Sequence, residues 1–475
     1  MILQQMPLIE ALFEYIKEDI TRYHMPGHKG GQGFNGEILD SLAQIDVTEV
    51  PGLDNLHNPQ GPIYNAQRLA SKAFGSDQTW FLVNGSTSGI HAMILAACPP
   101  GSSLIVPRNC HKSVINALIM GDIFPVYILP EYDEDKELVT QVSPLAIEEA
   151  LERNPNAEGV LLVSPNYYGM CPNVEEIANI VHKAGKVLLV DEAHGAHFPF
   201  NPRLPCSAGE LGADLWVHSA HKTLPSFTQT AYLHLKGNRV DKDRVSRILS
   251  MNQTSSPSYI FMASLDWARC FMEVKGHDLL DNLIDNLEKV RQQLRRIGID
   301  SISNSIWPEV KAFDPTRLVL DFRGLGLTGY QAEKLLRDEE RLQIEMSDHR
   351  YGVLICTVAD NRTDLQKIVQ ACQNLWQKHR GNKNIHFPMS ISREIPKQMM
   401  SPRQAFYSKI QKIPLNESQG RIAACTIGAY PPGIPRYCPG ELIEEEGIEE
   451  LIFIHRKGGT LFGVDERNYI DVVVE

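Results

Sequence analysis

The chain has 475 residues and a formal net charge of −12, with 58 acidic against 46 basic side chains. This length allows two or three domains with sizeable cores, and 43% hydrophobic with 22% charged residues describes an ordinary globular protein. DNA, RNA and anionic membranes all favour clustered Lys and Arg, so the acidic balance disfavours nucleic acid or a membrane as partner. No stretch approaches 18 uninterrupted apolar residues, which argues against a membrane span.

The nine cysteines are scattered and include no C-x-x-C pair, which disfavours both a zinc ribbon and a disulfide framework. The first residues combine neither a basic region nor a long apolar core, so they do not resemble a signal peptide. We therefore expect a reduced, cytoplasmic protein.

After an N-terminal arm (1–60), short apolar runs alternate with helical patterns such as "VEEIANIVHKAG" (174–185). The runs are almost continuous Val, Ile and Leu, which is typical of strands covered on both faces. We expect an α/β domain over 61–300 with a mostly parallel sheet, whose ligands bind beyond the carboxyl ends of the strands. The predicted strands span 79–83, 103–107, 159–165, 186–192, 214–220 and 230–235.

Polar residues follow several of these strands. The turn Asn84–Gly89 opens a helix, and free backbone N–H groups with nearby hydroxyls would bind an anion there, although Ser or Thr could simply cap the helix. His111 follows the second strand and could lie flat on an aromatic ligand or be an ordinary buried histidine. Asp191 ends the strand "VLLVD" within a helicase-like Asp-Glu-Ala-His box, but no G-x-x-x-x-G-K-[ST] loop occurs in the chain. The acid therefore serves another chemistry.

The dipeptide His-Lys occurs four times, and its position separates the candidates for a reactive lysine. Lys183 lies in an amphipathic helix, and Lys29 lies in a Gly-rich segment outside the predicted sheet. Lys112 and Lys222 both follow strands, but only Lys222 lies within "HSAHKT", among hydroxyls and imidazoles. Burial there would lower the pKa of the amine.

An anion-binding turn, a strand-end Asp and a Ser-x-His-Lys 31 residues later together predict a pyridoxal 5'-phosphate (PLP) site. Asp191 would keep the pyridine nitrogen protonated, and Lys222 would hold the aldehyde covalently. These residues alone leave the reaction open among a decarboxylase, an aminotransferase and an aldolase-type lyase.

The sequence resembles the bacterial ornithine/lysine/arginine decarboxylases, which are PLP enzymes of fold type I. The resemblance extends over nearly the whole chain, in order. Its matching stretches are "RYHMPGHKGG" (22–31), "DVTEVPGLDNLHNPQGPI" (46–63), "VNGSTSGIHAMILA" (83–96), "RNCHKSVINAL" (108–118), "VDEAHGAHF" (190–198), "SAHKTLPSFTQTAYLH" (219–234), "TSSPSY" (254–259) and "AYPPGIPRYCPGE" (429–441).

The resemblance implies roles for individual residues. His111 would stack on the ring, Asp191 would pair with its nitrogen and Lys222 would carry the cofactor. Thr254 or Ser255 would reach the cofactor phosphate of a neighbouring subunit, which implies a homodimer or a dimer-based oligomer. Within one subunit, the phosphate ligands would be Ser86, Thr87, Ser219 and His221.

Two departures accompany the resemblance. The large inducible members carry an N-terminal receiver-like wing domain, which this sequence does not start with, so it is more similar to the shorter arginine-decarboxylase-type members. Their decameric assembly is accordingly not expected. Those large members also have Trp where this sequence has His194, which we nevertheless place among the cofactor-contacting residues.

The remaining sequence predicts a small α/β domain (301–385) followed by a C-terminal domain (386–475) of the same family type. The small domain contains a strand (317–322), a helix (328–339) and a second strand (351–360). A polar stretch with scattered Pro and Lys, from about 378 to 418, would join the small domain to the last segment. The Pro-rich 430–441 is not expected to form regular structure and would form a rigid loop.

The expected reaction is α-decarboxylation of a basic amino acid, arginine ahead of lysine and ornithine, giving agmatine, cadaverine or putrescine for polyamine biosynthesis. Glu441, at the end of the Pro-rich loop, is the candidate for binding the substrate's distal cation, although an exposed, solvated Glu would look the same. The pairs His194/His197 and His218/His221 have spacings that a metal could use, but the PLP interpretation already accounts for two of these histidines, so no metal is expected.

Overall fold

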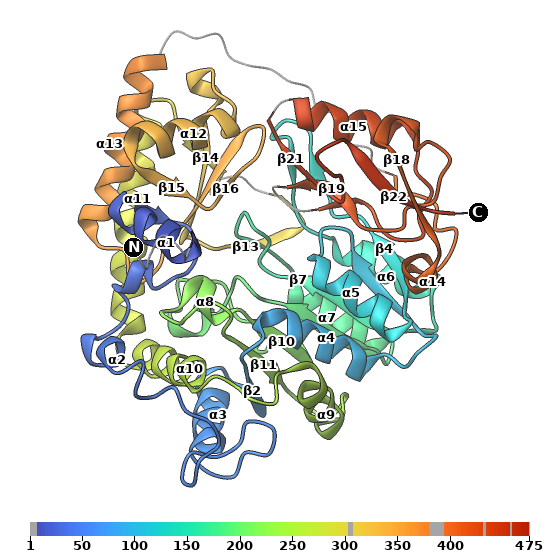
Figure 1. The fold of residues 1–475 in the computed structure, drawn as a ribbon, viewed down its shortest axis with the longest axis horizontal. Helices are drawn as coiled ribbons and strands as arrows, with labels where there is room; N and C mark the ends of the chain where they lie inside the picture. Colours follow the sequence, from blue (N-terminus) through green and yellow to red (C-terminus); the bar gives the residue numbers. More distant parts are fainter. Residues whose placement is uncertain (1–6, 303–306, 380–393, 431–433, 457, 475) are drawn as a thin grey trace.

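A seven-stranded sheet forms the centre of the largest part of the molecule, in a computed structural model that describes residues 7–302, 307–379, 394–430, 434–456 and 458–474 (Figure 1). Only β11 runs antiparallel to its neighbours, so the other six strands point the same way. The strands, in spatial order, are β2 (Gln78–Leu82), β11 (Ala231–Leu235), β10 (Leu215–His218), β9 (Val187–Asp191), β7 (Ala157–Val163), β3 (Ser103–Pro107) and β4 (Phe124–Ile128).

Each of the six predicted strands is present, and β4 is the strand that sequence reasoning missed. Its sequence is Phe-Pro-Val-Tyr-Ile, and it pairs only with β3 at the edge of the sheet. Phe124 is exposed and the next three residues are half-buried. An edge strand tolerates proline and is covered less completely than a central one, so β4 lacks the continuous apolar run by which the others were found.

Helices cover both faces of the sheet. Within β9, Leu189 packs into one apolar cluster with α4, α5 and α9, whereas its neighbour Val190 packs into another with α6 and α7. Adjacent strand residues point to opposite faces, which explains the apolar runs without alternation. The helices of this part are α3 (Pro62–Ala73), α4 (Gly85–Ala97), α5 (Lys112–Gly121), α6 (Pro144–Arg153), α7 (Val174–Lys183), α8 (Ala220–Thr223), α9 (Lys242–Asn252) and α10 (Tyr259–Phe271).

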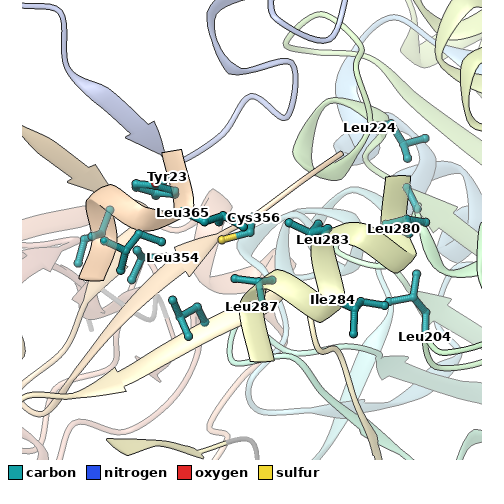
Figure 2. Close-up of a cluster of buried hydrophobic side chains, with 14 of the residues drawn as sticks. Tyr23, Leu204, Leu224, Leu280, Leu283, Ile284, Leu287, Leu354, Cys356 and Leu365 are labelled. Carbon is teal, nitrogen blue, oxygen red and sulfur yellow. The ribbon is translucent and has the colours of Figure 1, made fainter. Parts of the chain in front are cut away.

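The long helix α11 (His277–Arg295) connects this part to a smaller unit. Its apolar face presents Leu283 and Leu287 to a shared core that also contains Leu224 near α8 and Leu354 of β17 (Figure 2). The same core includes Tyr23 of the N-terminal strand β1 (Thr21–Tyr23), which pairs in parallel with β15 (Leu342–Ile344). The smaller unit contains the sheet β12 (Asp300–Ser301), β14 (Arg317–Asp321), β17 (Tyr351–Ile355) and β16 (Met346–Ser347), with α12 (Gly329–Glu340) and α13 (Arg362–His379).

The N-terminal segment contributes α1 (Pro7–Lys17) and α2 (Gly36–Asp40), beside the smaller unit and α10 respectively (Figure 1). Two short pairings complete the first two-thirds of the chain: β5 (Tyr132–Asp133) with β6 (Leu138–Val139), and β8 (Met170–Pro172) with β13 (Val310–Phe313). Among the described residues, no helix is long and apolar enough to cross a membrane.

The last segment forms a unit beside β4, α5 and α6 (Figure 1). The polar stretch from about 378 to 418 contains two regular elements in its second half, and its residues 380–393 lie outside the described range. The expected loop 430–441 is also partly strand, although 431–433 are not described. The elements are α14 (Pro402–Tyr407), β18 (Ile410–Pro414), β19 (Ile427–Tyr430), β20 (Pro435–Tyr437), α15 (Glu445–Arg456), β21 (Thr460–Phe462) and β22 (Tyr469–Val473).

Candidate active site

The carboxyl ends of β2, β9 and β10 meet at one edge of the central sheet, because these strands run in the same direction. The turn into α4 follows β2, Asp191 is the last residue of β9, and Ser219 follows β10 directly before Lys222. The topology thus brings together residues that lie up to 138 positions apart in the chain, from Asn84 to Lys222.

An anion cradle forms where α4 begins. Gly85 has φ +72°, a conformation that favours glycine, and the chain turns there into the helix. The Ser219 hydroxyl donates to Ser86 Oγ at 2.8 Å, and Thr87 lies partly exposed in the same first turn. The N–H groups of a first helical turn have no partner within the helix, so this corner offers several donors to an anion.

His221 lies on α8, beside this corner. Its Nδ1 is 3.0 Å from the Thr230 carbonyl oxygen, which can only accept, so Nδ1 carries a proton and Nε2 is left for another partner. Burial lowers the pKa of His221 to about 4. An anion bound at Nε2 would favour the doubly protonated ring.

Lys222 has the environment of a reactive amine. Its Nζ lies 2.9 Å from His194 Nε2 and 5.9 Å from the centre of the Tyr167 ring. Burial lowers the pKa of Lys222 to about 8, against the opposing attraction of Asp191. A substantial fraction of this amine is therefore neutral, and nucleophilic, near neutral pH.

Asp191 is 5% exposed and incompletely hydrogen-bonded. Its Oδ1 accepts from the Ala193 N–H at 3.1 Å, whereas Oδ2 accepts no hydrogen bond within the described part of the chain. Burial raises the pKa of Asp191, and the charge of Lys222 opposes that shift. A cation or an N–H donor at Oδ2 would complete this site.

His111 and Thr254 lie nearer the surface. His111 caps α5, with Nδ1 2.8 Å from the Ser113 hydroxyl, and its ring is exposed. Thr254 is exposed after α9, where its carbonyl accepts from His57 at 2.8 Å and its hydroxyl accepts from the Ser256 N–H at 3.2 Å. Neither contact joins Thr254 to the turn at Ser86.

Glu441 has a different role from the one expected of it. It is fully buried, and its two oxygens accept from Arg108 Nη1 and Nη2 at 2.6 Å each, while Oε2 also accepts from the Cys438 N–H. Arg108 further donates to the carbonyls of Pro435 and Arg436. The solvated alternative is therefore wrong, and the substrate contact stays a prediction that this geometry does not favour, because Glu441 joins the C-terminal unit to the end of β3.

Three nearby residues escaped sequence reasoning: Arg317, Tyr167 and Glu345. Arg317 Nη2 lies 3.0 Å from His194 Nδ1, the rings of Tyr167 and His194 are 4.7 Å apart, and the charge of Glu345 acts on Lys222. A buried arginine at the start of the apolar strand "RLVLDF" is the one signal that could have found any of them. Nothing in the sequence places the other two beside the sheet.

The N-terminal motif "RYHMPGHKGG" also packs on the site. The Gly27 N–H donates to the His221 carbonyl at 2.7 Å, and Lys29 is buried, with Nζ donating to the Ile355 carbonyl at 2.7 Å. The segment that contains Gly27 and Lys29 therefore links α8 to β17. In each of the two histidine pairs with metal-compatible spacing, one histidine contacts a carboxylate. His197 lies 3.2 Å from Asp314, and His218 lies 2.6 Å from Glu192.

These groups fit PLP by their chemistry. The donors at the start of α4 can bind a phosphate, and Asp191 Oδ2, which accepts no hydrogen bond from the described residues, can accept one from a protonated ring nitrogen. A neutral lysine amine can react with an aldehyde. The fold and the site together define a fold type I PLP-dependent enzyme.

The comparisons with known proteins agree. The model of the Orn/Lys/Arg decarboxylase major domain matches residues 6–319, and that of the family's C-terminal domain matches residues 387–458. The arginine decarboxylase of Bacillus subtilis is 37% identical over 94% of this chain and 92% of its own length, whereas the lysine decarboxylase of Hafnia alvei is 23% identical over 94% and 74%. A solved lysine decarboxylase from Pseudomonas aeruginosa superposes with a TM-score of 0.79 at 21% identity, covering 98% of this chain and 80% of that one.

The chain belongs to the Orn/Lys/Arg decarboxylase family and is a decarboxylase. Members of this family are PLP-dependent, as are fold neighbours such as an alanine–glyoxylate aminotransferase from Nostoc (TM-score 0.59, 14% identity, 75% of this chain and 95% of that one).

Proposed function

We propose that this enzyme binds PLP at Lys222 and removes the α-carboxylate of arginine, with lysine and ornithine as poorer substrates. The observation that supports arginine as the substrate is a difference in sequence identity. Relatives named arginine decarboxylase are 36–37% identical to this chain, whereas those named lysine decarboxylase are 23% identical to it. The products would be agmatine and carbon dioxide, and agmatine is a precursor for polyamine biosynthesis.

The residues divide the work of cofactor binding. Lys222 would attach the cofactor through its amine, and Asp191 Oδ2 would accept the proton of the ring nitrogen. The phosphate would be held by the first turn of α4, by the hydroxyls of Ser86, Thr87 and Ser219 and by His221 Nε2. When bound, PLP supplies the electron sink that accepts the bond electrons of the departing carboxylate. Lys222, as an ammonium, would hold the proton that replaces the carboxylate at Cα.

The environment of the ring is asymmetric. His111 has an exposed ring at the rim and would stack on one face of the cofactor, whereas His194 and Tyr167 lie on the side of Lys222. Decarboxylation requires the Cα–carboxylate bond to stand perpendicular to the ring, where it overlaps the π system. Groups that fix the substrate's orientation therefore decide between decarboxylation and transamination.

Because both carboxylate oxygens of Glu441 are paired with Arg108, we take Glu345 as the candidate residue for binding the substrate's distal cation. It is half-buried between β15 and β16, Oε2 accepts from the Met25 N–H at 2.8 Å, and its charge acts on both Lys222 and Arg317. A guanidinium can use a carboxylate that already accepts one backbone hydrogen bond, because each oxygen has two acceptor sites.

We also propose a cytoplasmic homodimer or dimer-based oligomer. All nine cysteines are free thiols, which suits a reducing compartment. Thr254 and the loop around His57 are exposed and hydrogen-bonded to each other, and they form the surface through which one subunit would reach the phosphate site of its neighbour. A fully active monomer in light scattering would contradict the oligomeric proposal.

One panel tests the reaction and the substrate together. Purified enzyme with PLP is incubated with arginine, lysine or ornithine, each with and without a keto-acid acceptor, and carbon dioxide and amines are quantified. We expect carbon dioxide and agmatine from arginine at the highest kcat/KM, independent of the keto acid. Keto-acid-dependent loss of the amino group without carbon dioxide would instead identify an aminotransferase, and preference for another substrate would overturn the arginine assignment.

A further inference from the structure

Arg317 lies deep between the smaller unit and the site. It opens β14, its side chain is 1% exposed, and its Nη2 lies 3.0 Å from His194 Nδ1. The other ring nitrogen of His194, Nε2, lies 2.9 Å from Lys222 Nζ. The imidazole is thus held between a guanidinium and the reactive amine.

The donor inventory of these three groups fixes the positions of the protons. A guanidinium has five N–H donors, no acceptor, and remains protonated in proteins, so His194 Nδ1 must accept and carries no proton. A neutral imidazole then has its proton on Nε2, and Nε2–H can donate to Lys222 Nζ only when that amine is neutral. An ammonium at Lys222 could not accept this bond, since it has no lone pair.

We propose that Arg317 is a positioning residue that keeps the proton of His194 on Nε2, so that His194 presents only a hydrogen-bond donor to Lys222 and to the reacting end of a bound cofactor. Lys222 is thereby favoured as the neutral amine that attacks an aldehyde. This inference rests on the proposed role of Lys222, and its first test uses protein without cofactor.

Arg317 is itself rigidly held. Its Nε lies 3.8 Å from Asp314 Oδ2, and Arg291 Nη2 donates to the Arg317 carbonyl at 2.9 Å. Gly169 packs on its stem, where a Cβ would lie 2.8 Å from Arg317 Cγ. The stem of Arg317 therefore has little room to move, and its Nη2 contacts both Nδ1 and the carbonyl oxygen of His194, as a positioning role requires.

Other groups also face His194 and Lys222. The charges of His111 and His221 act on His194, whose pKa burial lowers well below its ordinary value, while Asp191 and Glu345 act on Lys222. The pKa of Lys222 is about 8, lowered by burial first and by the charge of Arg317 to a smaller extent. A test must therefore separate the hydrogen bond of Arg317 from its charge.

The matched pair Arg317→Gln and Arg317→Met makes that separation. Both remove the charge and are of similar length, but the Gln amide can still donate to an unprotonated His194 Nδ1, or accept from a protonated one, whereas Met can do neither. Arg317→Lys retains both charge and donor. In apoprotein labelled with ¹⁵N at histidine, long-range ¹H–¹⁵N spectra report which ring nitrogen is protonated, and a His194→Gln spectrum identifies the His194 signals.

We expect an unprotonated Nδ1 and a protonated Nε2 for His194 in the wild type and in Arg317→Lys, and more of this tautomer in Arg317→Gln than in Arg317→Met. In Arg317→Met we expect the proton to move to Nδ1, wholly or in part, because Lys222 can then donate to Nε2. A protonated Nδ1 in the wild type would overturn the proposal even if the Met variant failed to fold. Retention of the wild-type tautomer by a folded Arg317→Met variant would also overturn it, because no donor to Nδ1 would then be needed.

A second readout follows the reactive amine. The rate of covalent PLP capture by apoprotein, measured by absorbance against pH, reports the neutral fraction of Lys222. We expect Arg317→Met to move the midpoint up by about one pH unit relative to Arg317→Gln, which is about tenfold slower capture below the midpoint. Equal midpoints would contradict the tautomer mechanism. Neither measurement depends on which amino acid is decarboxylated, so failure here and failure of the proposed reaction remain distinguishable.

Discussion

Asp191 and Glu441 are both buried carboxylates near the carboxyl ends of central strands, and they differ in whether their oxygens are already used. Glu441 meets the guanidinium of Arg108 with both oxygens and accepts a third hydrogen bond from the Cys438 N–H. Asp191 accepts one hydrogen bond, from the Ala193 N–H, and burial raises its pKa. A buried carboxylate whose oxygens all accept hydrogen bonds holds structural units together. A buried carboxylate with an oxygen that accepts none can still bind a ligand.

The basic partners differ in the same way. Arg108 donates from all three guanidinium nitrogens and also lies 4.6 Å from the centre of the Tyr127 ring. Lys222 has one hydrogen-bonded neighbour among the described residues, His194, and burial lowers its pKa to about 8. Arg108 therefore stays charged, whereas the amine of Lys222 can lose its proton and react.

The largest expected effect is on turnover, from Asp191→Asn. Removing the partner of a buried cationic ring is expected to reduce kcat by about two to four decades, equivalent to about 3–5 kcal/mol. The unfolding free energy of the apoprotein should not fall, because burial disfavours the charged carboxylate and Asn is neutral. Steady-state kinetics and urea unfolding measure both quantities. Near-normal kcat would remove Asp191 from the electron-sink role.

Glu441→Gln should show the opposite pattern. Leaving the Arg108 guanidinium buried without its counter-charge is expected to lower the unfolding free energy by about 3 kcal/mol, while kcat/KM of the folded fraction changes less than about threefold. Glu449→Gln, an exposed substitution on α15, is the control and should change neither. A stable Glu441→Gln enzyme with a greatly increased KM for arginine would restore Glu441 as a substrate ligand.

Sequence reasoning succeeded where a function depends on one strand and the turn after it. The six apolar runs fixed the strand ends, and Asp191, Ser219 and Lys222 follow from them because parallel strands end at a common edge. Whether Lys222 carries PLP stays a prediction. The apolar core on the two faces of the central sheet could be located from the apolar composition of the strands alone.

Sequence reasoning failed to predict contacts between segments that lie far apart in the chain. The partners of Glu441 lie 333 residues away at Arg108, and those of His194 lie 123 residues away at Arg317. No periodicity or spacing encodes such contacts, and a glutamate looks alike in sequence whether its oxygens are free or occupied. The Pro-rich context of Glu441 suggested a loop at a ligand site, whereas residues 435, 436 and 441 in fact accept hydrogen bonds from Arg108.

Glu345→Gln sharpens the comparison at the substrate side. Loss of one charged acceptor for the guanidinium is expected to raise KM for arginine about tenfold with a smaller change in kcat. The uncharged analogue citrulline is the matched control, since its kcat/KM or inhibition constant should change little. Equal effects on arginine and citrulline would mean that Glu345 acts by holding the Met25 backbone and not by binding the cation.

The smallest expected change in a rate comes from the pH dependence that separates Lys222 from Arg108. The pKa of Lys222 is lowered from 10.5 to about 8 in the folded apoprotein, so between these values the unfolded chain binds more protons than the folded one. Stability should therefore rise with pH from about 8 towards 10.5, and the unfavourable contribution of the buried amine should be fully present below about 8. Over the same titration, PLP capture should accelerate roughly fivefold between pH 7 and 8, following the neutral fraction of an amine with this pKa. Lys222→Met should lack both the capture and this rise in unfolding free energy, whereas Glu441→Gln, less stable at every pH, should retain both with the same midpoint. A wild-type stability curve parallel to that of Lys222→Met across this range would show that the amine is not shifted, and would remove the chemical distinction drawn between the two buried sites.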